Sequence, residues 1–192
     1  MTRFTLKPVG WRPRLDPVQA ETATPAQLAA LEACPPAQRR STYFLTLAHD
    51  PGSLGERGAL FNIVMYAEGG LPRADRELST AVVSMVNGCV YCTQVHAKRF
   101  VELTGAEAAM QRILDDGWEA EPDARRNAIA AFTEALTRDP GATTPAHLAP
   151  LRAAGLDDLE ILDLIHSIAM FANANRLMLT LGDPLLPREL RG

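Results

Sequence analysis

Apolar residues recur along most of this chain at the spacing of one buried helix face, and glycine or proline follows where each run stops. The clearest run covers residues 73–86, where the apolar positions follow the i, i+3, i+4, i+7, i+8 series of an amphipathic helix. Asn87-Gly88 then ends the run, because glycine directly after the last periodic residue is the usual helix stop. The apolar positions are Leu78, Ala81, Val82, Met85 and Val86.

The whole chain, examined in this way, predicts an all-α protein. No sustained alternation of apolar and polar residues indicates a strand, and no short repeat is present. About eight or nine helices are expected, in a single helical domain that spans residues 24–192. The expected segments are 24–33, 37–48, 54–66, 73–86, 89–104, 106–114, 122–137, 144–154 and 157–181.

Residues 1–23 have a different character. Pro8, Pro13 and Pro17 exclude a helix, while Trp11 and its apolar neighbours are too many for a free tail. We expect an extended N-terminal arm that packs either on its own domain or on a neighbouring subunit. Because a single small domain would leave such an arm poorly covered, we also expect a homo-oligomer.

Composition narrows the class of protein. The chain has 192 residues, 47% of them hydrophobic, which is enough to bury a core. Its net charge is −4, from 19 basic and 23 acidic residues, which argues against a nucleic-acid-binding surface. No apolar run is long enough for a membrane span, and the first residues lack the apolar core of a signal peptide. A cytoplasmic protein without nucleic-acid or membrane partners is therefore expected.

Four residues stand in the pattern E-x11-C-x2-C-x3-H: Glu77, Cys89, Cys92 and His96. On a helix that begins at Cys89, the two cysteines lie about 60° apart and Cys92 lies about 40° from His96, one turn further on. All three then share one stripe. The cysteines fall in the first helical turn, where free backbone N–H groups and the helix dipole favour a thiolate, so a lowered pKa is possible for thiols at this place.

Glu77 precedes Gly88 by 11 residues, and His96 follows it by 8. These helical arms are about 16 Å and 12 Å long. If the Asn-Gly break folds the two helices into an antiparallel hairpin, the carboxylate of Glu77 returns beside His96. The carboxylate would orient the imidazole and raise its basicity, and the imidazole would exchange protons with a thiol. The pattern therefore predicts a carboxylate–imidazole–dithiol relay.

This pattern resembles the signature of the alkylhydroperoxidase D family, within the carboxymuconolactone decarboxylase-like superfamily. Beyond the motif and its two helices, the N-terminal extension and the segment Phe171-Ala-Asn-Ala-Asn-Arg176 are more loosely similar to the peroxidase-related branch of that family. The resemblance implies an all-helical fold, oligomers of helical protomers (a dimer, trimer or hexamer), and thiol peroxidase activity without haem, metal or another bound cofactor.

The resemblance also implies roles for the four residues. Cys92 would be the peroxidatic cysteine and Cys89 its resolving partner, while Glu77 and His96 would form the proton relay. The substrate would be an organic peroxide or hydrogen peroxide, and an external dithiol of the lipoyl or thioredoxin type would reduce the disulfide. The sequence departs from the family at Tyr91, where the founding peroxidases carry a second histidine.

Other interpretations of these residues are open. Glu77, Cys89, Cys92 and His96 could instead be ligands in a zinc-binding module, although structural zinc sites usually draw ligands from separate segments. The protein could also be a low-turnover redox sensor or a structural member of the family, and two cysteines on a helix can simply be buried packing residues. Three polar residues within the last helix, Asn173, Asn175 and Arg176, are expected to hydrogen-bond loop backbones or a subunit neighbour.

Overall fold

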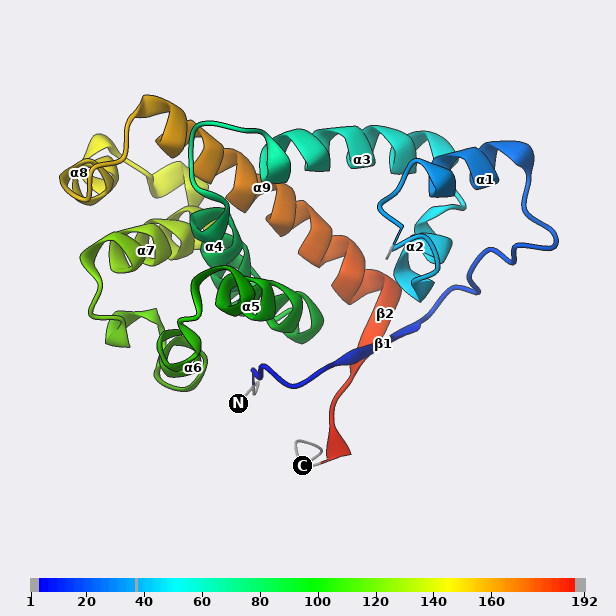
Figure 1. Ribbon diagram of the computed structural model, residues 1–192, viewed down its shortest axis with the longest axis horizontal. Helices are drawn as coiled ribbons and strands as arrows, with labels where there is room; N and C mark the ends of the chain where they lie inside the picture. The colour runs from blue at the N-terminus through cyan, green and yellow to red at the C-terminus, as the bar shows by residue number, and fades with distance from the viewer. Residues whose placement is uncertain (1–3, 37, 189–192) are drawn as a thin grey trace.

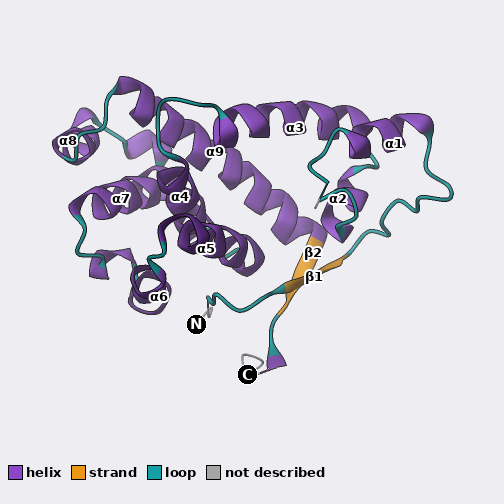
Figure 2. Ribbon diagram, in the orientation of Figure 1, coloured by secondary structure: helices purple, strands orange, loops and turns teal. Residues whose placement is uncertain are grey.

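The computed structural model describes residues 4–36 and 38–188, and within these ranges nine α-helices make up most of the chain (Figure 1). Two short strands and two 3₁₀ turns complete it (Figure 2). The all-α prediction of about eight or nine helices is confirmed. The elements are β1 Gly10–Pro13, α1 Pro25–Glu32, α2 Thr42–Leu47, α3 Pro51–Tyr66, α4 Arg73–Val86, α5 Val90–Thr104, α6 Glu107–Asp116, the 3₁₀ turn Trp118–Ala120, α7 Ala124–Arg138, the 3₁₀ turn Pro140–Ala142, α8 Pro145–Ala153, α9 Asp158–Leu181 and β2 Gly182–Leu185.

Most helix ends follow local signals in the sequence. Thr24 and Asp157 each cap a helix in a capping box, α1 and α9 respectively. Gly88, at φ 75°, occupies the left-handed conformation directly after the C-cap of α4, which a residue with a Cβ rarely adopts. The predicted and observed ends therefore agree closely where a capping residue or a glycine stands in the sequence.

The helix predicted over residues 37–48 is wrong in its first half. Residue 37 lies outside the described residues, and α2 begins only at Thr42. Ser41 precedes it and accepts a hydrogen bond from the amide of Phe44, so the hydroxyl caps the helix start. The apolar spacing did not reveal this late helix start. A serine side chain such as that of Ser41 hydrogen-bonds nearby backbone groups, so it favours a position at a helix N-cap over one inside a helix.

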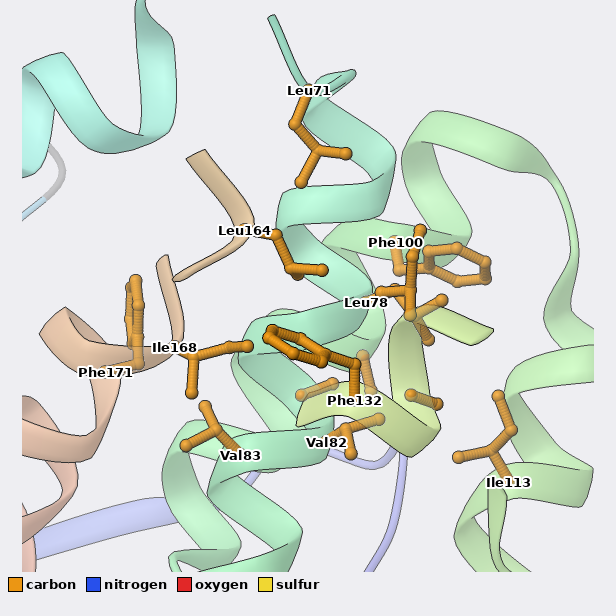
Figure 3. Packing of buried hydrophobic residues seen from close by; sticks show 14 of the residues in the cluster. Leu71, Leu78, Val82, Val83, Phe100, Ile113, Phe132, Leu164, Ile168 and Phe171 are labelled. Atoms are coloured by element: carbon orange, nitrogen blue, oxygen red, sulfur yellow. The ribbon is translucent and has the colours of Figure 1, made fainter. Parts of the chain in front are cut away.

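Helix α4 lies at the centre of the core, between α5, α7 and α9 (Figure 3). Its nearly unexposed positions Leu78, Val82 and Val83 face Phe132 of α7 and Ile168 of α9. Ten of the 14 residues of α4 are buried, including polar ones, because neighbouring helices cover it on several sides. This packing makes α4 a rigid base for the side chains that it directs toward α5.

The N-terminal arm forms a strand, which the sequence analysis did not predict. β1 pairs with β2 in antiparallel fashion, with Trp11 opposite Pro184. Trp11 is buried, and its indole Nε1–H donates to the carbonyl of Met178 at 3.2 Å. A Cβ at Gly182 would lie 2.3 Å from the Trp11 ring, so only glycine fits beneath the indole. The arm therefore packs on the same chain, against the end of α9.

Of the helices in the described part of the chain, none is both long and apolar enough to cross a membrane.

Candidate active site

The hairpin of α4 and α5 brings Glu77 and His96 together, as their spacing about Gly88 predicted. The carboxylate Oε2 of Glu77 lies 2.5 Å from Nδ1 of His96. Glu77 is fully buried and His96 is 5% exposed. The imidazole also meets the edge of the Phe171 ring, with the ring centroids 4.5 Å apart. The carboxylate and the aromatic ring therefore fix the orientation of His96.

The second oxygen of Glu77 is paired with arginine, a feature that the motif did not include. Arg73 Nε donates to Oε1 at 2.8 Å, a second nitrogen of its guanidinium also contacts this oxygen, and Arg99 Nη1 lies 4.0 Å away. Arg73 stands four residues before Glu77 on α4, a spacing at which helical side chains meet, so the sequence did contain this signal.

Burial and these charges set the protonation of the pair. Burial alone would raise the pKa of Glu77, but the charges of His96 and Arg73 and their hydrogen bonds hold it below its ordinary value. Burial lowers the pKa of His96, although Glu77 opposes the effect, so the imidazole is neutral near pH 7. A neutral ring that donates Nδ1–H to Glu77 keeps Nε2 as a proton acceptor.

Cys89 is the N-cap residue of α5, and Cys92 lies in its first turn. Both are buried free thiols. A hydrogen bond from the Cys92 thiol lowers the pKa of Cys89 below that of an ordinary thiol, against the effect of burial, and the amides of Cys92 and Tyr91 act in the same direction. The pKa of Cys92 is raised well above the ordinary value, because this thiol donates to Cys89 and because it is buried. The lowered pKa that a first-turn thiol can have is therefore found at Cys89 and not at Cys92.

Asn175 joins the last helix to this site. It is fully buried, and its Nδ2 donates to Ser84 Oγ at 3.0 Å while its Oδ1 accepts from Asn87 Nδ2 at 3.0 Å. The same amide lowers the pKa of both Cys89 and Cys92. Asn175 therefore bonds to side chains of α4 and its C-cap, and not to the loop backbone that the sequence analysis proposed among its partners.

The other two polar residues of this segment do not reach the dithiol site. Arg176 donates from Nη1 to the carbonyl of Ala172 on the same helix, and both Asn173 and Arg176 are exposed. Only Asn175 is directed into the interior, because it lies on the face of α9 that packs against α4.

A cavity of about 270 Å³ opens beside Cys92 and His96. Cys89 does not line it, so only one of the two thiols faces this space. Tyr91, which stands where the resemblance implies a histidine, is also in the wall, and burial raises its pKa. The remaining wall comes from α2, α3, α5 and α9. Its aromatic and charged members are Tyr43, Phe44, Arg57, Phe61, Arg99 and Phe171.

The described residues contain no group of three or more histidine, cysteine, aspartate or glutamate side chains placed to hold a metal ion. In particular, Glu77 is already bound by His96 and Arg73. The geometry thus gives no support to the zinc-module interpretation of the four motif residues.

Comparisons with known proteins agree with the family resemblance that the cysteine motif indicated. Residues 57–134 match the model of the carboxymuconolactone decarboxylase family. No curated protein matches the chain in sequence. The alkylhydroperoxidase AhpD core of an uncharacterized peroxidase-related protein from Ralstonia eutropha JMP134 superposes with a TM-score of 0.73 at 24% identity, covering 86% of this chain and 88% of that one.

Two further structures share the fold. An uncharacterized peroxidase-related protein from Silicibacter sp. TM1040 has a TM-score of 0.75 at 24% identity, covering 100% of this chain and 98% of that one. The debrominase Bmp8 has a TM-score of 0.71 at 16% identity, covering 88% and 90%. The family match over residues 57–134 and the alkylhydroperoxidase D-like fold both agree with the resemblance drawn from the motif.

Proposed function

We propose that the protein is a thiol-dependent peroxidase that reduces organic peroxides or hydrogen peroxide through a dithiol–disulfide cycle of Cys89 and Cys92. One observation carries the proposal: Cys92 opens on a cavity that it shares with His96, and His96 is held by the buried carboxylate of Glu77. A nucleophile and a neutral base thus line one space of substrate size, and a carboxylate behind its wall orients the base.

Of the two thiols, Cys89 is the more acidic and Cys92 holds its proton more tightly, as the directions of their pKa values indicate. When a peroxide enters the cavity, Nε2 of His96 takes the proton of Cys92, and Glu77 stabilises the resulting imidazolium. The Cys92 thiolate attacks the outer peroxide oxygen, so that an S–O bond forms and the O–O bond breaks. The departing alkoxide takes the proton back from His96 and leaves as an alcohol.

The second half of the cycle uses the other thiol. The Cys89 thiolate attacks the sulfenic acid on Cys92, the disulfide forms, and hydroxide leaves as water after protonation. An external dithiol of the lipoyl or thioredoxin type then reduces the disulfide by thiol–disulfide exchange. In total, one peroxide and two thiols give one alcohol, one water and one disulfide, and no bound cofactor is proposed.

Thiol titration tests this cycle. The protein is treated with one equivalent of cumene hydroperoxide, and free thiols are counted before and after. We expect two thiols to disappear, and mass spectrometry to show the loss of two hydrogens on the peptide that spans Cys89 and Cys92. Dihydrolipoamide should restore both thiols and support repeated turnover. Formation of the disulfide without turnover on a dithiol would favour the redox-sensor alternative, and retention of both thiols would contradict any redox role.

A second candidate is thiol-dependent removal of a halogen from an aromatic ring. The debrominase Bmp8 shares this fold, and a variant of it is known in complex with 2,3,4-tribromopyrrole. The aromatic wall beside Cys92 favours such a substrate. An aryl bromide and two thiols would give the arene, bromide, a proton and the disulfide. The test compares two substrates in the presence of a dithiol: 2,3,4-tribromopyrrole, followed by the release of bromide, and cumene hydroperoxide, followed by its consumption. Faster turnover of the tribromopyrrole would favour this function over the peroxidase.

A further inference from the structure

The cavity beside Cys92 is apolar over most of its wall but carries positive charge. Among the described residues that line it, two are arginines, Arg57 and Arg99, and none has a carboxylate. The nearest acid, Glu77, is buried behind the wall and already bonded to His96 and Arg73. The charge of the cavity is therefore only partly balanced by the protein itself.

Arg57 of α3 is the less balanced of the two cations. Its guanidinium carbon lies 5.8 Å, 5.4 Å and 5.8 Å from the ring centroids of Tyr43, Phe44 and Phe61, and it forms no ion pair with a described residue. Arg99, in contrast, lies 4.0 Å from the carboxylate of Glu77. Rings that hold a guanidinium through its π-face leave its N–H edge available for a planar anion.

A second unpaired donor lies beside Arg57. The hydroxyl of Tyr43 is buried in a residue that is only 5% exposed, and its O–H donates to no described residue. Burial raises the pKa of Tyr43 to about 12, against the charge of Arg57, so the phenol is a neutral donor. A buried donor without an acceptor is rare and calls for an explanation, and an absent ligand oxygen is one.

We propose, on the basis of the peroxidase function above, that the cavity selects organic hydroperoxides that carry a carboxylate, with the apolar body against the aromatic wall and the carboxylate on Arg57. Hydrogen peroxide is too small to contact the rings, and an uncharged hydroperoxide leaves Arg57 unpaired. A charge-assisted hydrogen bond of this kind corresponds to about 10- to 100-fold in kcat/KM.

Two hydroperoxides with the same aromatic body test the preference: cumene hydroperoxide and its derivative with a carboxylate in the para position. The wild-type protein is expected to prefer the carboxylated compound by at least about tenfold. In Arg57→Gln this ratio should fall to about one, and Arg57→Lys should restore part of it. Arg138→Gln removes the same charge from an exposed site outside the cavity, and it should keep the wild-type ratio.

A binding measurement separates failure of this inference from failure of the peroxidase function. In a Cys92→Ser background, calorimetry compares 4-isopropylbenzoate with uncharged cumene, neither of which can react. Tighter binding of the benzoate that is lost in Arg57→Gln supports the carboxylate site, even if no hydroperoxide is consumed. If the wild type consumes cumene hydroperoxide at least as fast as the carboxylated compound, and if the benzoate binds no better than cumene, the inference is overturned while the peroxidase function stands.

Discussion

The acidity of Cys89 is expected to depend on the thiol of Cys92. In the structure, the hydrogen bond from Cys92 is the largest influence that lowers the pKa of Cys89, and burial opposes it. Replacement of Cys92 by alanine removes the donor and leaves the burial. Replacement by serine keeps a hydroxyl donor at the same place. The pKa of Cys89 should therefore rise in Cys92→Ala and rise less, or not at all, in Cys92→Ser.

The size of the effect follows from the kind of bond that is lost. A hydrogen bond to a charged acceptor is worth about 1.5–3 kcal/mol, and a thiol is a weak donor, so the lower end applies. A loss of about 1.5 kcal/mol corresponds to roughly tenfold less Cys89 thiolate at any pH below its pKa. The converse holds for Cys92: in Cys89→Ala its pKa should fall, because both the acceptor and the like charge that raise it are gone.

The measurement is a pH titration of the thiolate by its ultraviolet absorbance, which does not require a reagent to reach the buried sulfur. All variants carry Cys34→Ala, so that a single thiol titrates in each. Cys34 is buried, and its Sγ–H donates only to the carbonyl of Ala30, so this background is mild. Equal midpoints for Cys89 in the alanine and serine variants would refute the reasoning.

Four further predictions follow from the site and its surroundings. Cys89→Ser should consume about one equivalent of peroxide and stop, with a sulfenic acid on Cys92 that dimedone traps; a sulfenic acid trapped on Cys89 in Cys92→Ser would reverse the assignment of the two thiols. Glu77→Gln should slow peroxide consumption by about 10²–10⁴-fold in stopped-flow assays without changing the stoichiometry of two thiols per peroxide, because the carboxylate acts through His96; an unchanged rate would exclude the relay. The free energy of unfolding in urea should fall as the pH drops below about 6.5, because His96 takes up a proton more readily in the unfolded chain than in the folded state, where burial lowers its pKa. The dependence of this free energy on pH should be weaker in His96→Gln. The protein should be a homo-oligomer by light scattering, because α3 exposes large apolar side chains such as Leu60 and Ile63; a monomer at micromolar concentration would contradict this.

The basis of the oligomer prediction changes with the structure. The sequence analysis inferred an oligomer from an arm that a single domain would leave uncovered. Val9, Trp11 and Val18 of that arm are buried within one chain, so the arm no longer requires a partner subunit. The exposed apolar positions of α3 now support the prediction instead.

The features that local patterns determine were predictable from the sequence. Helical periodicity and the Asn87-Gly88 stop together predicted the α4–α5 hairpin, and the spacing within it predicted the contact of Glu77 with His96. Helix periodicity and glycine position act over a few residues, so one sequence is enough to detect them. Glu77 and His96 accordingly meet as the pattern indicated, whereas Cys89 is the N-cap of α5 and does not line the cavity that Cys92 and His96 share.

The features that depend on distant segments were not predictable. The strand pair joins residue 11 to residue 184, and four residues are too few for an alternating pattern to stand out. Asn175 reaches Asn87 and Ser84 only because α9 packs against α4, and the cavity wall draws on α2 and α3, whose positions no local signal fixes. The order of acidity of the two cysteines likewise depends on a hydrogen bond between their side chains, which spacing does not give.

The pairing of β1 with β2 has a consequence for synthesis of the chain. Trp11 and Met178, which pack in one buried cluster with Cys89 and Cys92, come from opposite ends of the sequence. Contacts between residues so far apart form late, since the intervening chain must be in place first. On the ribosome, the arm and the cysteines emerge well before α9 and β2 do. The dithiol therefore lacks the cover of α9 until that helix has left the ribosome, and oxidants or folding catalysts can reach its thiols in the nascent chain.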